Sequence, residues 1–201
     1  MSVRPLAMPP AALSSTAFKA TIVKPERLFR VSGYIVDKPY FGWSGRNRFD
    51  APGPAKPVFG ASYLGMSLHV AVAESLLHDE EPVDGRFLVA PGRLARQFVH
   101  RYEGVPLKLL SLIGATLKRL DGSAELTGAD NYLLAQQWSL AVFQNSADYD
   151  GFIYASRHHT TGKAVVLFDR CAGKIRQSSH TQLPLVAGFT RMCADFGIAG
   201  A

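Results

Sequence analysis

The sequence predicts a single α+β domain in which short strands form mixed or antiparallel sheets with flanking helices. The chain has 201 residues, of which 47% are apolar and 19% charged, enough to bury one core. Most apolar segments are short and bounded by glycine, proline or aspartate, which is typical of strands. Strands and helices do not alternate regularly along the chain, so a doubly wound parallel sheet is disfavoured.

The expected strands are short apolar stretches between turn residues. Pro91-Gly92 ends one of them, and Gly162-Lys163 and Asp169-Arg170 flank another. The expected ranges are 28–31, 58–64, 87–89, 97–102, 107–113, 152–155 and 164–168.

Three segments are predicted to be helical. Ser67 is a suitable N-cap for a helix over residues 68–78. Residues 130–145 show the best helical spacing, with Trp138 and Val142 on one apolar face, so Trp138 is expected in the core. A terminal helix is expected from Pro184 onward.

The remaining segments predict a leader and a long loop. Residues 1–20, with Met8-Pro9-Pro10, are expected to form a partly ordered leader, and residues 21–201 the domain itself. Residues 39–57 are rich in glycine, proline and aromatic side chains. Because so much aromatic surface is costly in a plain linker, we expect a structured binding loop there.

The net charge of +6 favours acidic partners. The basic residues are scattered, which favours a small anion or an acidic protein over a polynucleotide. Two cysteines do not make a disulfide framework, so a reducing compartment is the default, although one disulfide stays open. The first residues lack the apolar core of a signal peptide, and no apolar stretch is long enough to span a bilayer. A cytoplasmic protein without membrane contact is therefore expected.

Glu74 is the first candidate for a functional residue. On a helix it shares a face with Val70, Ala71 and Leu77. A carboxylate on an apolar face is costly to bury unless it has a partner. The alternative is a half-exposed glutamate at the helix flank that pairs with a nearby base.

Arginines form the second group of candidates. Arg48 lies in the loop rich in glycine and aromatics, and a guanidinium there could bind a diphosphate with two hydrogen bonds. Arg46, two residues earlier, could serve instead. Arg30, at the end of the first expected strand, could also contact phosphate. The alternative for each is an ordinary surface arginine.

Tyr63, Ser156 and Arg157 lie at strand ends. Tyr63 ends the strand before the Glu74 helix and could stack on a flat base while its hydroxyl is hydrogen-bonded. Ser156-Arg157 follows a strand, where side chains often face a ligand. The alternatives are a tyrosine at the edge of the core and an ordinary turn.

Other chemistries fit the sequence less well. His158 and His159 with Cys171 do not have the spacing of a zinc site, so no metal is expected. Ser156 with a histidine and Asp150 could suggest a hydrolase triad, but the G-x-S-x-G turn is missing. Glycine-rich phosphate loops are also missing.

Several stretches resemble the RES domain of bacterial toxin–antitoxin toxins, over residues 28–170. Glu74 follows Tyr63 by eleven residues, as in that family, whereas the loop from Arg48 to Tyr63 is longer and Phe49 replaces a frequent tryptophan. The matching stretches are Arg48-Phe49-Asp50, Phe59-Gly60-Ala61-Ser62-Tyr63-Leu64, Ala71-Val72-Ala73-Glu74, Gln137-Trp138, Asp150-Gly151-Phe152-Ile153-Tyr154-Ala155-Ser156-Arg157 and Leu167-Phe168-Asp169.

The resemblance implies a fold related to ADP-ribosyltransferases and an enzyme that degrades NAD. The bond cleaved is the one between nicotinamide and ribose, with water or phosphate as acceptor. Some relatives instead transfer ADP-ribose to a protein. It also implies an antitoxin of the Xre type, a helix-turn-helix protein that blocks the site, so that nucleic acid is contacted only through the antitoxin. Formation of a homo-oligomer stays open.

The resemblance also implies roles for the candidates. Cleavage of an N-glycosidic bond builds positive charge on the ribose, which a carboxylate stabilises, and Glu74 would take this role. Arg48 and Arg30 would hold the diphosphate, Tyr63 would stack on the nicotinamide side, and Ser156 would bond a ribose hydroxyl or the carboxamide. Arg46, Phe49 and Arg157 complete the expected binding residues. The competing hypotheses are mono-ADP-ribosyl transfer to a protein and a basic RNA-binding module without enzymatic activity.

Overall fold

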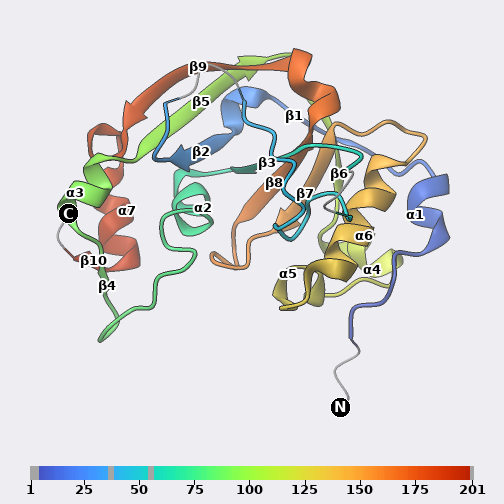
Figure 1. The fold of residues 1–201 in the computed structure, drawn as a ribbon, viewed down its shortest axis with the longest axis horizontal. Helices are drawn as coiled ribbons and strands as arrows, with labels where there is room; N and C mark the ends of the chain where they lie inside the picture. Colours follow the sequence, from blue (N-terminus) through green and yellow to red (C-terminus); the bar gives the residue numbers. More distant parts are fainter. Residues whose placement is uncertain (1–4, 36–38, 54–56, 200–201) are drawn as a thin grey trace.

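A curved eight-stranded sheet runs through the computed structural model, which describes residues 5–35, 39–53 and 57–199 (Figure 1). Its order is β1-β6-β7-β8-β3-β2-β5-β9, and the pairs are antiparallel except β6 and β7, which are parallel. The strands are β1 (Thr21–Val23), β2 (Phe29–Ser32), β3 (Ala61–Gly65), β5 (Phe98–Gly104), β6 (Leu107–Ser111), β7 (Gly151–Ala155), β8 (Lys163–Phe168) and β9 (Ile175–Gln182). A second, parallel pair joins β4 (Phe87–Leu88) to β10 (Ile198–Ala199). The predicted α+β domain with a mixed sheet is confirmed.

The α-helices lie on the concave side of the sheet in three groups (Figure 1). One end carries α3 (Pro91–Ala95) and α7 (Phe189–Phe196), and α2 (Leu68–Ala73) lies in the middle. The other end carries α1 (Ala11–Ser15), α4 (Gly114–Arg119), α5 (Glu125–Gly128) and α6 (Tyr132–Phe143). Short 3-10 turns occur at η1 (Pro25–Arg27), η2 (Asp169–Lys174) and η3 (Leu183–Leu185). None of the helices formed by the described residues has the length and apolarity needed to cross a membrane.

Separate hydrophobic clusters support the two halves of the concave side. The first surrounds α6 and contains Trp138, Phe152 and Phe168, all nearly inaccessible to solvent, as predicted for Trp138. The second joins α2 and α7 through residues such as Val72 and Met192. α2 contributes to both clusters, since its Val70 lies in the first and its Ala71 and Val72 lie in the second.

Most predicted elements are present, with shifted ends. The strand expected over residues 58–64 begins at Ala61, and the terminal helix begins at Phe189 because Pro184 lies in η3. The helix expected over residues 68–78 was wrong at its end. It stops at Ala73, since the backbone N–H groups of Leu76 and Leu77 both bond the carbonyl of Val72 and both leucines turn into the core.

The part of the expected leader that the structure describes packs against α6. Leu13 of α1 is fully buried, and the Asn145 amide donates to the carbonyls of Leu13 at 2.5 Å and Thr16 at 2.9 Å. The Trp138 indole donates to the carbonyl of Ala7 at 2.9 Å. Residues 1–4 of that leader, and residues 54–56 of the expected loop, lie outside the described residues.

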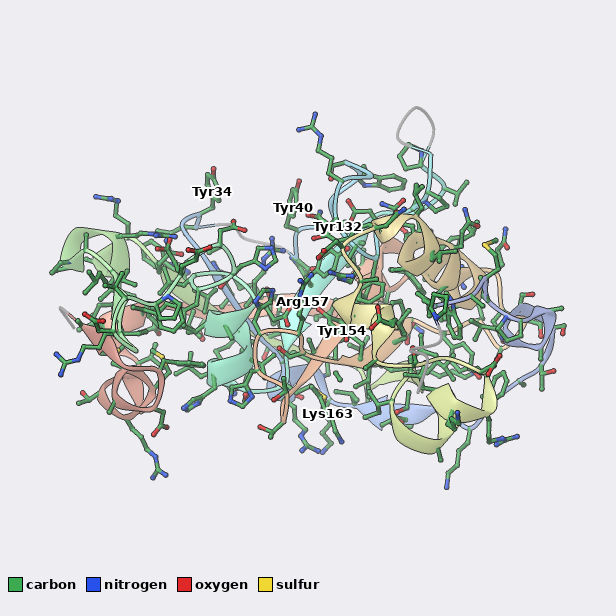
Figure 2. The ribbon with its side chains drawn as sticks, turned by 90° about the horizontal axis from the view of Figure 1, so that it is seen from below. Tyr34, Tyr40, Tyr132, Tyr154, Arg157 and Lys163 are labelled. Carbon is green, nitrogen blue, oxygen red and sulfur yellow. The ribbon has the colours of Figure 1, made fainter. Side chains whose placement is uncertain are left out.

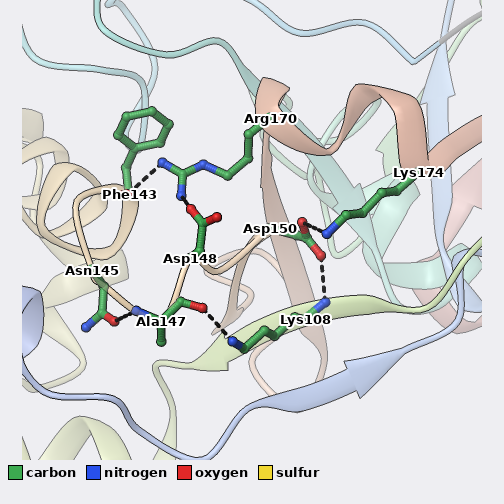
Figure 3. A network of polar contacts seen from close by, with 8 residues as sticks. All are labelled: Lys108, Phe143, Asn145, Ala147, Asp148, Asp150, Arg170 and Lys174. Carbon is green, nitrogen blue, oxygen red and sulfur yellow. Dashed lines mark hydrogen bonds and ion pairs between the residues drawn. The ribbon is translucent and has the colours of Figure 1, made fainter.

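Asp150 ties together three elements at the start of β7 (Figure 3). Its carboxylate is 2% exposed, accepts the backbone N–H of Lys108 at 2.8 Å and pairs with Lys174 at 2.7 Å. Next to it, Gly151 lies so close to β8 that an added Cβ would come within 2.0 Å of the Val166 carbonyl oxygen. Asp150 and Gly151, which begin the Asp-Gly-Phe-Ile-Tyr-Ala-Ser-Arg stretch, therefore have a structural role.

Replacing Asp150 by asparagine is expected to lower the free energy of unfolding by about 2 kcal/mol. The amide has a single acceptor oxygen, so its NH₂ group would face either the Lys108 N–H or the Lys174 ammonium, both of which are donors. Urea denaturation measures the loss. Asp148→Asn is the matched control: Asp148 pairs with Arg170, its side chain is 82% exposed, and the loss should stay below about 1 kcal/mol. Equal losses in the two variants would contradict a special role for Asp150.

Candidate functional site

A cavity of about 320 Å³ lies between α2 and the N-terminal end of α6, with β3 and β7 as its base. This volume falls within the range of small-molecule sites, roughly 300–1,000 Å³. Figure 2 shows Tyr40, Tyr132, Tyr154 and Arg157, which line the cavity, close together near the middle of the molecule. Five further candidates from the sequence also line the cavity: Arg30, Arg48, Phe49, Tyr63 and Glu74.

Glu74 reaches the cavity from the C-cap position of α2, directly after Ala73. The predicted N-cap is confirmed, since the Ser67 hydroxyl accepts the N–H of Val70 at 3.2 Å. Gly65 lets α2 lie directly on β3, because a Cβ there would come within 2.5 Å of the Ala71 nitrogen. This close packing places the carboxylate of Glu74 over the sheet instead of in solvent.

Two hydroxyl groups hold the Glu74 carboxylate. The Ser156 hydroxyl donates to Oε1 at 2.5 Å, and the Tyr154 hydroxyl donates to Oε2 at 3.4 Å. Tyr154 and Ser156 are two residues apart along β7 and its extension, so their side chains point to the same face. Burial and the adjacent Glu74 raise the pKa of Tyr154 well above its ordinary value, so this phenol remains a hydrogen-bond donor.

The loop that carries Arg48 is organised around the buried Asp50. The Asp50 carboxylate accepts hydrogen bonds from the hydroxyls of Tyr63 at 2.9 Å and Ser44 at 2.8 Å, and from Asn47. From α6, the Gln136 amide donates to two carbonyls of the same loop. The described part of the expected binding loop is thus structured, and it presents Arg48 to the cavity.

Three guanidinium groups face the cavity. Arg48 donates to the carbonyl of Ala129 and lies 4.4 Å from the centre of the Tyr132 ring. Arg30 donates to the carbonyl of Tyr40 at 3.1 Å, and Arg157 pairs with Asp130 at 3.2 Å. Burial lowers the pKa of Arg30 and of Arg48, yet an arginine stays protonated in proteins. Among the described residues, the cavity therefore combines three arginines with the carboxylate of Glu74, which suits a polyanion.

Two expected binding residues, Tyr63 and Phe49, form the wall of the cavity. The Tyr63 hydroxyl bonds Asp50 and receives the N–H of Phe49 at 3.0 Å, and burial raises its pKa well above the ordinary value. Phe49 is 1% exposed and packs edge-on against Phe152. Both therefore hold the arginine loop against the sheet.

Arg46 lies apart from the other candidates. It is exposed and borders a separate shallow hollow beside α6, with Asp130 and Gln136. Of the two arginines between which the sequence left the choice open, Arg48 is the one that lines the cavity.

Several residues of the cavity had not been expected. Tyr154 lies in the Tyr-x-Ser-Arg stretch, and the two-residue period of a strand could have linked it to Ser156. Tyr132 and His78 carried no signal in the sequence. Tyr40 belonged to the expected binding loop without being singled out, and His158 had been considered only as a zinc ligand. They meet only because α2, α6 and the loops fold around one opening.

The hydrolase-triad alternative finds no support in the geometry. No group of three or more His, Cys, Asp or Glu side chains is placed to hold a metal within the ranges that the structure describes. Cys171 and Cys193 are buried free thiols, and burial raises the pKa of Cys171 to about 12. Asp150 and Ser156 lie at opposite ends of β7, roughly 20 Å apart along the strand.

Comparison with known proteins gives two results. The family model of the RES domain matches residues 24–186. A solved structure, the crystal structure of the M. tuberculosis MbcT–MbcA toxin–antitoxin complex, contains a similar chain with a TM-score of 0.58 and 16% sequence identity. The match covers 88% of this chain and 90% of that chain, so the similarity concerns the whole fold. A comparison with curated proteins gives no match.

Proposed function

The chain belongs to the RES-domain family, and from this premise we propose that it degrades NAD by cleaving the bond between nicotinamide and ribose. The observation that carries the proposal is the Glu74 carboxylate, held by Ser156 and Tyr154 in a cavity that three arginines surround. A dinucleotide has the matching chemistry: a diphosphate for the arginines and a cationic glycosidic centre for the carboxylate.

The proposed reaction needs little more than a well-placed negative charge. As the glycosidic bond lengthens, positive charge develops on the ribose, and a carboxylate fixed by hydrogen bonds stabilises it without first reorganising. Ser156 and Tyr154 supply this fixation. Nicotinamide leaves as a neutral molecule, so the leaving group needs no acid.

We further propose that the protein is the toxin of a toxin–antitoxin pair. The similar chain of the MbcT–MbcA complex comes from such a pair. The partner would be an Xre-type helix-turn-helix antitoxin that covers the cavity, and the pair would act in the cytoplasm. Any contact with nucleic acid would then pass through the antitoxin.

The test is the amount of NAD and free nicotinamide over time with the purified protein, with and without phosphate. Release of nicotinamide is expected, with ADP-ribose as the product if water is the acceptor and its phosphate ester if phosphate is. Label from biotinylated NAD on protein would identify transfer of ADP-ribose instead. Intact NAD in every condition would refute the proposed function.

A further inference from the structure

Two histidines form a hydrogen-bonded pair on the cavity wall. His78 follows α2 and His158 follows β7, and both line the same cavity as Glu74. Nδ1 of His78 lies 2.8 Å from Nε2 of His158, with the ring centres 4.5 Å apart. Nε2 of His78 lies 3.6 Å from the carboxylate of Asp79, which is 90% exposed. The pair thus forms a chain of polar atoms from the cavity to solvent.

Hydrolysis of a glycosidic bond releases a proton from the attacking water, and a positioned side chain that takes this proton accelerates the step. Among the titratable side chains that line the cavity, the arginines are protonated and the pKa of Tyr154 is raised. Glu74 is already the acceptor of two hydrogen bonds and faces the charge on the ribose. Apart from the arginines, the tyrosines and Glu74, the titratable side chains that the structure places on the cavity wall are His78 and His158. Imidazole is the side-chain type suited to general-base catalysis.

The surroundings of His158 keep it neutral. Burial lowers its pKa, Glu74 opposes this, and the charges of His78, Arg157 and Arg48 lower it further. A neutral imidazole with one free nitrogen is the form that a general base requires.

We propose that His158 is the general base for water in the NAD cleavage and that His78 relays the proton to solvent. This inference rests on the proposed function and adds the acceptor: water is activated in the cavity. The water oxygen bonds the ribose carbon as the bond to nicotinamide breaks, and the bonding electron pair leaves with the nicotinamide nitrogen.

The proton follows the histidine pair. His158 accepts it at Nδ1 and passes the proton of Nε2 to Nδ1 of His78. His78 releases its Nε2 proton beside Asp79. Each histidine then carries one proton on the other nitrogen, and the original tautomers return by exchange with solvent.

The test compares two nucleophiles in the full-length protein: water alone, and added azide, which has no proton to lose. His158→Gln is expected to lower the rate of hydrolysis on the order of 10²-fold and to change the azide reaction by less than about threefold. His159→Gln is the matched control, since its ring lies among Phe196 and His69 instead of on the cavity wall, and it should leave both rates unchanged. His78→Gln should give a smaller loss of hydrolysis, because solvent can take the proton from His158 directly.

Four results would overturn parts of this inference, and a fifth would refute the proposed function on which it rests. Equal losses with water and azide in His158→Gln would indicate a structural role, and no loss with either would show that no base is needed there. An unchanged His78→Gln would remove the relay. Wild-type protein that consumes NAD only with phosphate would overturn the water base and leave the proposed function standing. Wild-type protein that consumes no NAD under any condition would refute the proposed function itself.

Discussion

Replacing Glu74 by glutamine is expected to lower the turnover of NAD on the order of 10²–10³-fold, with little change in KM. The glutamine side chain keeps the size of glutamate and can still accept from Ser156. It lacks the negative charge that opposes the positive charge on the ribose. The loss should therefore fall on the transition state and not on the binding of NAD.

The measurement is nicotinamide release under single-turnover and steady-state conditions. Glu80→Gln is the matched control, because Glu80 lies six residues later, pairs with Arg93 and is not part of the cavity wall. It should keep the wild-type rate. A Glu74→Gln protein with full turnover would remove the carboxylate from the mechanism.

Replacing Arg30 or Arg48 by glutamine is expected to raise the KM for NAD about 10–100-fold each. A hydrogen bond to a charged group contributes about 1.5–3 kcal/mol, and 1.4 kcal/mol corresponds to tenfold in affinity. Nicotinamide riboside, which lacks the diphosphate, should be cleaved with the same efficiency by these variants and by the wild type. The ratio of kcat/KM for the two substrates therefore measures diphosphate recognition.

Arg46→Gln serves as the control for both arginine variants. Arg46 has the same charge and lies two residues from Arg48, but it borders the separate shallow hollow. Its substitution should leave the KM for NAD near the wild-type value. A rise in KM with Arg46→Gln and none with Arg48→Gln would reverse the assignment that the cavity suggests.

Local chemistry explains which parts of the fold could be read from the chain. The Ser67 cap, the apolar β8 and the helix α6 with its buried Trp138 and Val142 follow from neighbouring residues, so their prediction succeeded. The single apolar face expected for this helix was wrong, because Gln136 and Ser139 are buried beside them and Leu133 is exposed. In contrast, β9 was missed because every residue after Ile175 in this strand is polar, and only its pairing with β5 makes it a strand. The end of α2 was missed for a similar reason, since burial of Leu76 and Leu77 in the core outweighs continued helix.

The same division holds for the candidate site. The sequence alone specified the residue types, their order and the family, because motifs such as Ala-Val-Ala-Glu and Tyr-Ala-Ser-Arg are contiguous along the chain. Tertiary structure decided which side chains meet. Ser156 donates a hydrogen bond to Glu74, 82 positions away in the sequence, and Arg48 donates one to the carbonyl of Ala129, 81 positions away. The choice of Arg48 over Arg46 and the pairing of His78 with His158 likewise depend on how distant segments pack. Such contacts depend on the packing of the whole domain, which periodicity and local propensity do not encode.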